Sequence, residues 1–197
     1  LESPEEFEWL HKDEGGFLEF FKNFLGQEKS VTKPMEFLTQ FKGIKNLSFT
    51  HCVEASKKDL DKIKDLGAII NHCPTSNRVL NNSRLKIENL DGIAYSIGTD
   101  GLSSNNSLQM FDELRNALMI HTSINVNELS KSLIKAATLN GAKALGLKKG
   151  KIEKAYDADL IVCKLPDKIK SEDELCTQLI LHTKYANRVF INGEQYV

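Results

Sequence analysis

Three short segments carry the pattern that predicts the fold: NLSFTHC at residues 46–52, AIINHCP at 68–74 and IAYSIGTDG at 93–101. Each begins as an apolar run of strand length and ends in polar side chains. Between the first two lies a helix pattern that Ser56 begins as a cap and Gly67 ends. Strands that alternate with helices predict an α/β fold with a parallel sheet.

The flanking segments extend this pattern. Residues 3–25 predict two helices, capped at Ser3 and broken at Gly15-Gly16, and their phenylalanines have the helical spacing of core residues. Apolar residues at helical spacing also predict helices over 108–120 and 128–145.

After Gly150 the pattern changes to β structure. Residues 158–164 and 188–191 are apolar strand candidates, and Asn192-Gly193 is a hairpin turn signal. We therefore expect a first unit over residues 1–150 and part of a small β domain over 151–197.

Composition narrows the class of protein. The chain has 197 residues, 41% of them hydrophobic and 27% charged, with a net charge of −1, which is typical of a globular protein and unlike a disordered one. The charges form no basic stripe, so no nucleic-acid partner is expected. No apolar run approaches the roughly 18–20 residues of a membrane span, so no membrane partner is expected either. The four cysteines form no C-x-x-C pair, which favours a reduced, cytoplasmic protein.

Polar residues follow each predicted strand: His51, His72 and Asp100. The carboxyl ends of parallel strands are where α/β proteins place their sites. Asp100 is the strongest candidate, as a metal ligand or general base, and His51 is the second. The alternatives are a turn-capping aspartate and histidines that brace the core.

The paired His-Cys dipeptides suggest a rival zinc site of His51, Cys52, His72 and Cys73. Neighbouring residues on a strand point to opposite faces, so the ligands of each dipeptide would diverge. Three more polar residues are candidates by position. Glu2 precedes the Ser3 cap, where an acid can simply favour a helix start, and the loop with Ser104 and Asn105 follows Asp100. The remaining histidines, His121 among them, are expected at the surface.

The ordered motifs resemble the amidohydrolase superfamily, in the branch of the chlorohydrolases and the adenosine and S-adenosylhomocysteine deaminases. The resemblance lies in THCV at residues 50–53, HCPTSN at 72–77, GTDG at 98–101 and SNN at 104–106, with DADLIV at 157–162 and VFING at 189–193 matching the small β domain. Within this branch, residues 1–25 resemble the 6-aminodeoxyfutalosine deaminases of menaquinone synthesis.

The resemblance implies the C-terminal half of a (β/α)8 barrel, with strands five to eight, the fifth being a partial strand that ends at Glu2, followed by part of a β-sandwich. It implies one zinc or iron ion, with Asp100 as a metal ligand, His51 beside the attacking water and Glu2 as a proton shuttle. His72, Ser104 and Asn105 would belong to the substrate pocket. The chain contains no H-x-H pair, so the remaining ligands are expected upstream of Leu1 and the chain is expected to be a fragment.

The implied activity is hydrolytic deamination of a purine-type small molecule, an adenine-type nucleoside, by a homo-oligomeric parent protein. Two alternatives remain open. One is another hydrolase of the same scaffold, such as a chlorohydrolase or a guanine or cytosine deaminase. The other is a non-catalytic fragment that self-associates through its unpaired strand edges.

Overall fold

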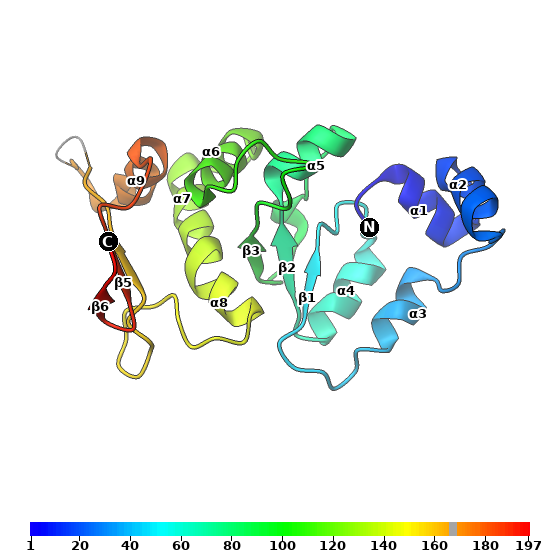
Figure 1. Ribbon diagram of the computed structural model, residues 1–197, viewed down its shortest axis with the longest axis horizontal. Helices are drawn as coiled ribbons and strands as arrows, with labels where there is room; N and C mark the ends of the chain where they lie inside the picture. The colour runs from blue at the N-terminus through cyan, green and yellow to red at the C-terminus, as the bar shows by residue number, and fades with distance from the viewer. Residues whose placement is uncertain (166–168) are drawn as a thin grey trace.

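The computed structural model describes residues 1–165 and 169–197. Its elements follow one another across the molecule, from α1, α2 and α3 at one end, through a central sheet, to β4, β5 and β6 at the other (Figure 1). No helix in the described part of the chain combines the length and apolar character that a membrane crossing needs. The four cysteines form no disulfide within the described residues.

The central sheet confirms the predicted parallel α/β pattern. Strands β1 (Ser48–Thr50), β2 (Ile69–His72) and β3 (Tyr95–Ile97) pair in parallel in the order β1-β2-β3. Thr50 pairs with Asn71, and Asn71 pairs with Ser96, so the three carboxyl ends meet at one edge of the sheet.

The two faces of this sheet differ in chemistry. Paired residues on neighbouring strands point to the same side, and Ile70 and Tyr95 point into the hydrophobic core. Thr50, Asn71 and Ser96 lie on the other face and are joined by side-chain hydrogen bonds. One side of the sheet is thus an apolar layer covered by helices, and the other is polar.

The predicted helices around the sheet form, with ends that lie within about two residues of the predicted ones. The helix α4 (Lys57–Asp65) has a complete capping box between Ser56 and Asp59. The helix α6 (Met110–Ile120) covers the predicted 108–120 segment. The predicted 128–145 helix is α7 (Val126–Lys135), a π-helical turn over Ala136–Asn140 and α8 (Gly141–Ala144). The helix α5 (Pro74–Asn81) and the 3-10 turn at Ile87–Asn89 lie between β2 and β3.

The first helices form as predicted, but their phenylalanines do not enter the core around the central sheet. The helices are α1 (Pro4–Lys12), capped by Ser3, and α2 (Gly16–Leu25). Trp9 is buried and stacks on Phe21, whereas Phe20 is 50% and Phe24 77% exposed. The core assignment of these phenylalanines was wrong because their helix packs mainly on α1 and its aromatic rings stack on one another. The helix α3 (Pro34–Thr39) follows and was not predicted.

The C-terminal segment forms the predicted antiparallel strands. They are β4 (Leu160–Val162), β5 (Arg188–Ile191) and β6 (Glu194–Gln195), in the order β4-β5-β6. Between them lie a 3-10 turn (Glu172–Glu174) and α9 (Leu175–His182), which the sequence did not predict. Ile180 of α9 is fully buried in the same core as the central sheet. The division at residue 150 stays a prediction.

The strand expected at the start of the chain, the fifth strand of the implied barrel, is not formed. Leu1 and Glu2 lie outside any strand, and the Leu1 carbonyl accepts a hydrogen bond from the Glu54 backbone. Within residues 1–165 and 169–197, the edge of β1 that faces away from β2 pairs with no strand.

A substitution at Leu133 tests whether the packing of α7 on the sheet stabilises the fold. This residue of α7 is fully buried, so Leu133→Ala leaves a cavity that should lower the free energy of unfolding by about 2–5 kcal/mol. Urea denaturation measures the change. Leu145→Ala is the matched control, since Leu145 is 74% exposed; equal losses from both variants would contradict the assigned core.

The unpaired edge of β1 is where the predicted self-association is expected to occur. An exposed strand edge offers free backbone groups to a second copy, and a lysine on the edge disfavours such pairing. We expect the 197-residue chain alone to form dimers or larger species, and Ser48→Lys to shift it toward monomer. Size-exclusion chromatography with light scattering measures this. Ser123→Lys, at an exposed loop position, should leave the association unchanged; a monomeric unsubstituted chain would overturn the expectation.

Candidate functional site

Three predicted residues meet at the carboxyl edge of the sheet. Glu2 lies just before α1, His51 follows β1 and Asp100 follows β3. Each offers one potential metal-ligating atom, and these atoms lie within 4.8 Å of one another. His51 Nδ1 is 3.5 Å from Glu2 Oε1, and His51 Nε2 is 3.8 Å from Asp100 Oδ2. It is the one such group found among the described residues.

The backbone at this edge is held in an unusual conformation. His51, Cys52 and Asp100 have φ values of 66°, 52° and 59°, in the left-handed region that favours glycine. Such conformations cost about 1–3 kcal/mol each for other residues and are concentrated at functional sites. Two of the three clustered side chains are therefore presented by strained turns directly after their strands.

Asp100 is held as a carboxylate by three donors. Ser76 Oγ donates to Oδ2 at 2.7 Å and Ser104 Oγ at 3.2 Å, while the Gly101 backbone donates to Oδ1 at 2.8 Å. The Ser76 hydrogen bond above all, followed by those of Gly101 and Ser104, lowers the pKa of Asp100 below its ordinary value. The group is thus ionised near neutral pH.

His51 is oriented by Asn77, which lies in the first turn of α5. Its Nδ1 is 2.8 Å from Asn77 Oδ1. A carbonyl oxygen only accepts, so Nδ1 carries a proton and the neutral ring keeps the lone pair of Nε2 on the side of Asp100. This is the tautomer that a metal or a water molecule beside Asp100 requires.

Glu2 provides an acceptor that nothing in the described residues satisfies. Its Oε1 is buried and has no hydrogen-bond partner, a state that carries a free-energy cost. Its main chain is fixed, because the backbone N–H donates to Glu6 Oε2 at 2.6 Å and the carbonyl accepts from Asn81 at 3.4 Å. Glu2 Oε1 is therefore positioned to bind a cation or a proton.

The donor set fits a divalent transition metal. Two carboxylates and an imidazole supply the oxygen and nitrogen ligands that zinc and iron accept in proteins. The rival cysteine site is wrong: in the parts of the chain described, His51, Cys52, His72 and Cys73 do not converge. Burial raises the pKa of Cys52 to about 11 and that of Cys73 to about 12, so both thiols stay protonated.

The predicted pocket residues have different surroundings. Ser104 contacts Asp100, whereas Asn105 donates to the Thr99 carbonyl and to Glu113. His72 is fully buried on the helix side of the sheet and faces His121. Their contacts with substrate stay predictions.

Ser76 and Asn77 hold the site but were not predicted to do so. Both stand in the HCPTSN motif at residues 72–77, but no separate role was predicted for them, and they bind Asp100 and His51. The signal was present, since both lie in the first turn after Pro74, a favoured first helical residue directly after a strand. Glu113 had no such signal, because it is one acid within an amphipathic helix.

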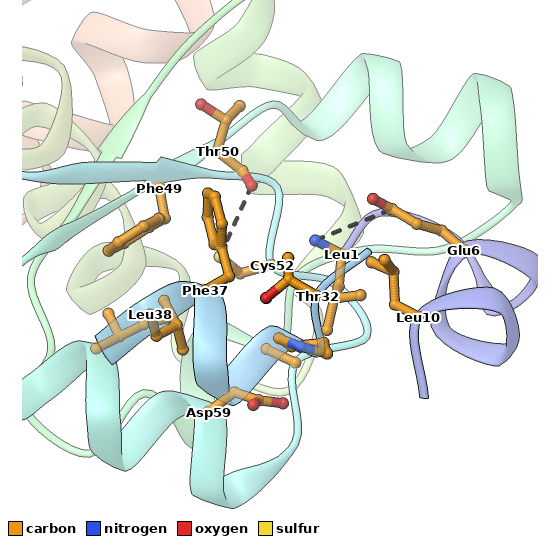
Figure 2. A pocket seen from close by; sticks show the side chains of 13 residues that line it. Leu1, Glu6, Leu10, Thr32, Phe37, Leu38, Phe49, Thr50, Cys52 and Asp59 are labelled. Atoms are coloured by element: carbon orange, nitrogen blue, oxygen red, sulfur yellow. Dashed lines mark hydrogen bonds and ion pairs between the residues drawn. The ribbon is translucent and has the colours of Figure 1, made fainter. Parts of the chain in front are cut away.

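An apolar cavity of about 420 Å³ lies beside the site, between β1, α3 and α4 (Figure 2). Phe37 and Leu38 of α3 and Phe49 of β1 form its walls, and the Leu1 amino group pairs with Glu6 at 3.9 Å on its rim. Its lining includes none of Glu2, His51 and Asp100. The strand-end cluster, rather than this cavity, carries the candidate chemistry.

Comparison with known proteins agrees with this geometry. The profile of the Amidohydrolase family matches residues 2–195. The chain belongs to the amidohydrolase family. An aminodeoxyfutalosine deaminase from a Nitratiruptor species is 42% identical over all of this chain, and an adenosine deaminase from Helicobacter pylori is 38% identical.

A solved relative gives the fold independently. The crystal structure of Helicobacter pylori aminofutalosine deaminase in complex with methylthio-coformycin is 36% identical and superposes over the whole chain with a TM-score of 0.94. The present chain covers 49% of that structure and 48% of the Nitratiruptor protein. It thus spans about half the length of the curated relatives it matches, in agreement with the predicted half of a barrel.

A buried histidine pair lies on the helix side of the sheet. His121 was expected at the surface, and this was wrong: it is fully buried at the end of α6. Its Nε2 lies 2.9 Å from His72 Nε2, and its Nδ1 lies 2.9 Å from Arg84, which is paired with Glu88. Burial, and then the neighbouring positive groups, lower the pKa of His72 to about 3 and that of His121 to about 4.

These pKa shifts predict sensitivity to acid. Both histidines bind protons near pH 6.5 when unfolded but stay neutral in the fold until about pH 4. The unfolded state therefore binds more protons as the pH falls from about 6.5 to 4, and each histidine lowers the free energy of unfolding by up to about 1.4 kcal/mol per pH unit. His121→Asn should flatten this part of the urea-denaturation profile, and His182→Asn, at an exposed position, should not. Identical profiles for His121→Asn and the unsubstituted chain would contradict the buried pair.

Proposed function

We propose that this chain is the C-terminal half of a metal-dependent deaminase that hydrolyses the amino group of an adenine-type nucleoside. The observation that carries the proposal is the convergence of Glu2, His51 and Asp100 within 4.8 Å. The names of its relatives support the substrate class, since they include an adenosine deaminase and a 5-methylthioadenosine/S-adenosylhomocysteine deaminase.

The finer parts of the proposal follow from the same relatives. The match to an aminodeoxyfutalosine deaminase over the whole chain favours 6-aminodeoxyfutalosine as the substrate and a place in menaquinone synthesis. We propose zinc or iron as the metal, a homo-oligomeric parent protein and a cytoplasmic location. Asp100 is the metal ligand within this chain, and further ligands come from residues outside it.

A bound metal would supply Lewis acidity, which would bring the pKa of a water molecule toward neutrality. Asp100 would hold the metal and accept a proton from the attacking water. His51 steadies the oxygen that becomes attached to the ring carbon, since its Nε2 faces the same side as Asp100 Oδ2.

Glu2 completes the proton transfers. The water oxygen bonds to the carbon that carries the amino group, and the carbon–nitrogen bond then breaks. Glu2 Oε1, which lacks a partner in the described residues, protonates the ring nitrogen as a general acid. It then takes the proton of the newly attached hydroxyl and passes it to the departing amine, and the proton that Asp100 accepted from water replaces the one that Glu2 first gave. Ammonia leaves and a keto purine remains.

The predicted pocket residues have supporting roles in this proposal. Ser104 binds Asp100 directly and so helps to orient the metal ligand. His72 comes directly before Cys73 and the first turn of α5, and its Nε2 lies 2.9 Å from His121 behind the sheet.

Asp100→Asn in the longest form that the gene encodes tests the assignment. The change keeps the shape and the tolerance for a left-handed backbone but removes the charge. Bound zinc and iron, measured by elemental analysis, should be lost. Ammonia release should fall by more than the roughly 10–100-fold typical of residues one shell further out. Asp91→Asn is the matched control, since Asp91 also has a positive φ, 47°, and lies at the surface.

An assay of ammonia release from several purines and pyrimidines separates the proposal from other hydrolases of this scaffold. Ammonia release from adenosine and 5′-methylthioadenosine supports it, whereas release only from guanine or cytosine assigns a different deaminase. Full activity and metal content in Asp100→Asn would refute the role of Asp100.

A further inference from the structure

A buried carboxylate lies behind the site and belongs to none of the roles above. Glu113 of α6 is 1% exposed. No Lys, Arg or His within the described residues forms an ion pair with it at 4.0 Å or less. A buried carboxylate without a cationic partner is costly unless hydrogen bonds compensate it, so its contacts indicate its purpose.

Its two oxygens bind two different segments. Oε1 accepts from Asn105 Nδ2 at 2.6 Å, in the loop after Asp100, and Oε2 accepts from the Thr75 backbone N–H at 3.3 Å, in the first turn of α5. The first turn of α5 has a second contact with α6, because Asn116 donates a hydrogen bond to the Thr75 hydroxyl at 2.6 Å. The helix α6 thus holds the first turn of α5 and the loop after β3 together.

Both segments hold the catalytic cluster. The first turn of α5 carries Ser76, which binds Asp100, and Asn77, which binds His51. In the loop, Asn105 also donates to the Thr99 carbonyl at 2.6 Å, directly before Asp100. Movement of either segment would therefore change the spacing between His51 and Asp100.

The amide of Asn105 is fully used by these contacts. Its nitrogen donates to Thr99 and Glu113, and its oxygen accepts from the Ser107 backbone at 3.1 Å. Because both N–H bonds are engaged and the side chain is buried, Asn105 is suited to holding the loop rather than to binding substrate.

We propose that Glu113 is a positioning residue, whose carboxylate ties the first turn of α5 to the Asp100 loop through Asn105 and thereby sets the geometry of His51 and Asp100. Its effect on catalysis rests on the proposed function, but its effect on the geometry does not. Residues that orient the ligands of a metal site typically change metal affinity or activity 10–100-fold when substituted.

Glu113→Gln is the direct test, because it keeps the shape and replaces one acceptor with a donor. The new amide must then face either Asn105 or the Thr75 N–H, donor against donor. Glu128→Gln on α7 is the matched control, since it makes the same change at an exposed position. Both are made in the longest form that the gene encodes.

Three readouts are compared with the unsubstituted protein. In NMR spectra, the Gly101 amide and the His51 ring should shift in Glu113→Gln and stay unchanged in Glu128→Gln. Zinc affinity, from competition with a chelator, should fall about 10–100-fold. The kcat for deamination should fall over the same range, with KM unchanged within about twofold.

The outcomes separate this proposal from the proposed function. Absence of deaminase activity in the unsubstituted protein refutes the function, while the NMR and zinc measurements still test Glu113. A folded Glu113→Gln with unchanged NMR shifts and zinc affinity overturns the positioning role.

If Glu113→Gln does not fold, Asn105→Ser tests the same connection with the carboxylate in place. Lower zinc affinity and kcat with unchanged KM support it. A raised KM with unchanged zinc affinity assigns Asn105 to substrate binding and overturns it.

Discussion

The parallel pairing of β1, β2 and β3 is the constraint on which the site depends. Parallel strands in register end at the same edge, so residues 49 positions apart, His51 and Asp100, come to lie with side-chain atoms 3.8 Å apart. The apolar face of the sheet packs on α6 and α7, which fixes the strands, and the polar face stays free for chemistry. The fold thus separates the groups that stabilise it from those that can react.

This arrangement has a cost that the neighbouring segments offset. His51 and Asp100 occupy left-handed backbone conformations, and Glu2 has a buried oxygen without a partner in the described chain. Hydrogen bonds from Ser76, Ser104 and Gly101 hold Asp100 in place and favour its ionised form. A group prepared in this way needs little rearrangement to accept a metal or a proton, which is how an active site gains from strain elsewhere.

Much of the fold was predictable because its signals are local. Ser3 and Ser56 cap helices at the predicted positions, and strands β1 to β5 were recognised from short apolar runs. Predictions failed where burial depends on a distant partner. The spacing of the α2 phenylalanines resembles that of a core helix whether or not another layer covers them, and α9 has a weakly amphipathic pattern whose burial depends on α6 and α7.

The residues of the site likewise divide into those that were predictable from the sequence and those that only the structure identified. From the sequence alone one could determine that polar, chemically capable residues follow the strands, because a strand's end is a local property of the chain, and so Asp100, His51 and, through the family motif, Glu2 were identified. Only the tertiary structure decided which groups hold them. Ser76, Asn77, Glu113 and the buried pair of His72 and His121 act through contacts between residues 24 to 49 positions apart. A hydrogen bond between distant segments forms only if the fold sets the donor–acceptor distance to within a few tenths of an ångström. No local pattern of residues encodes that distance.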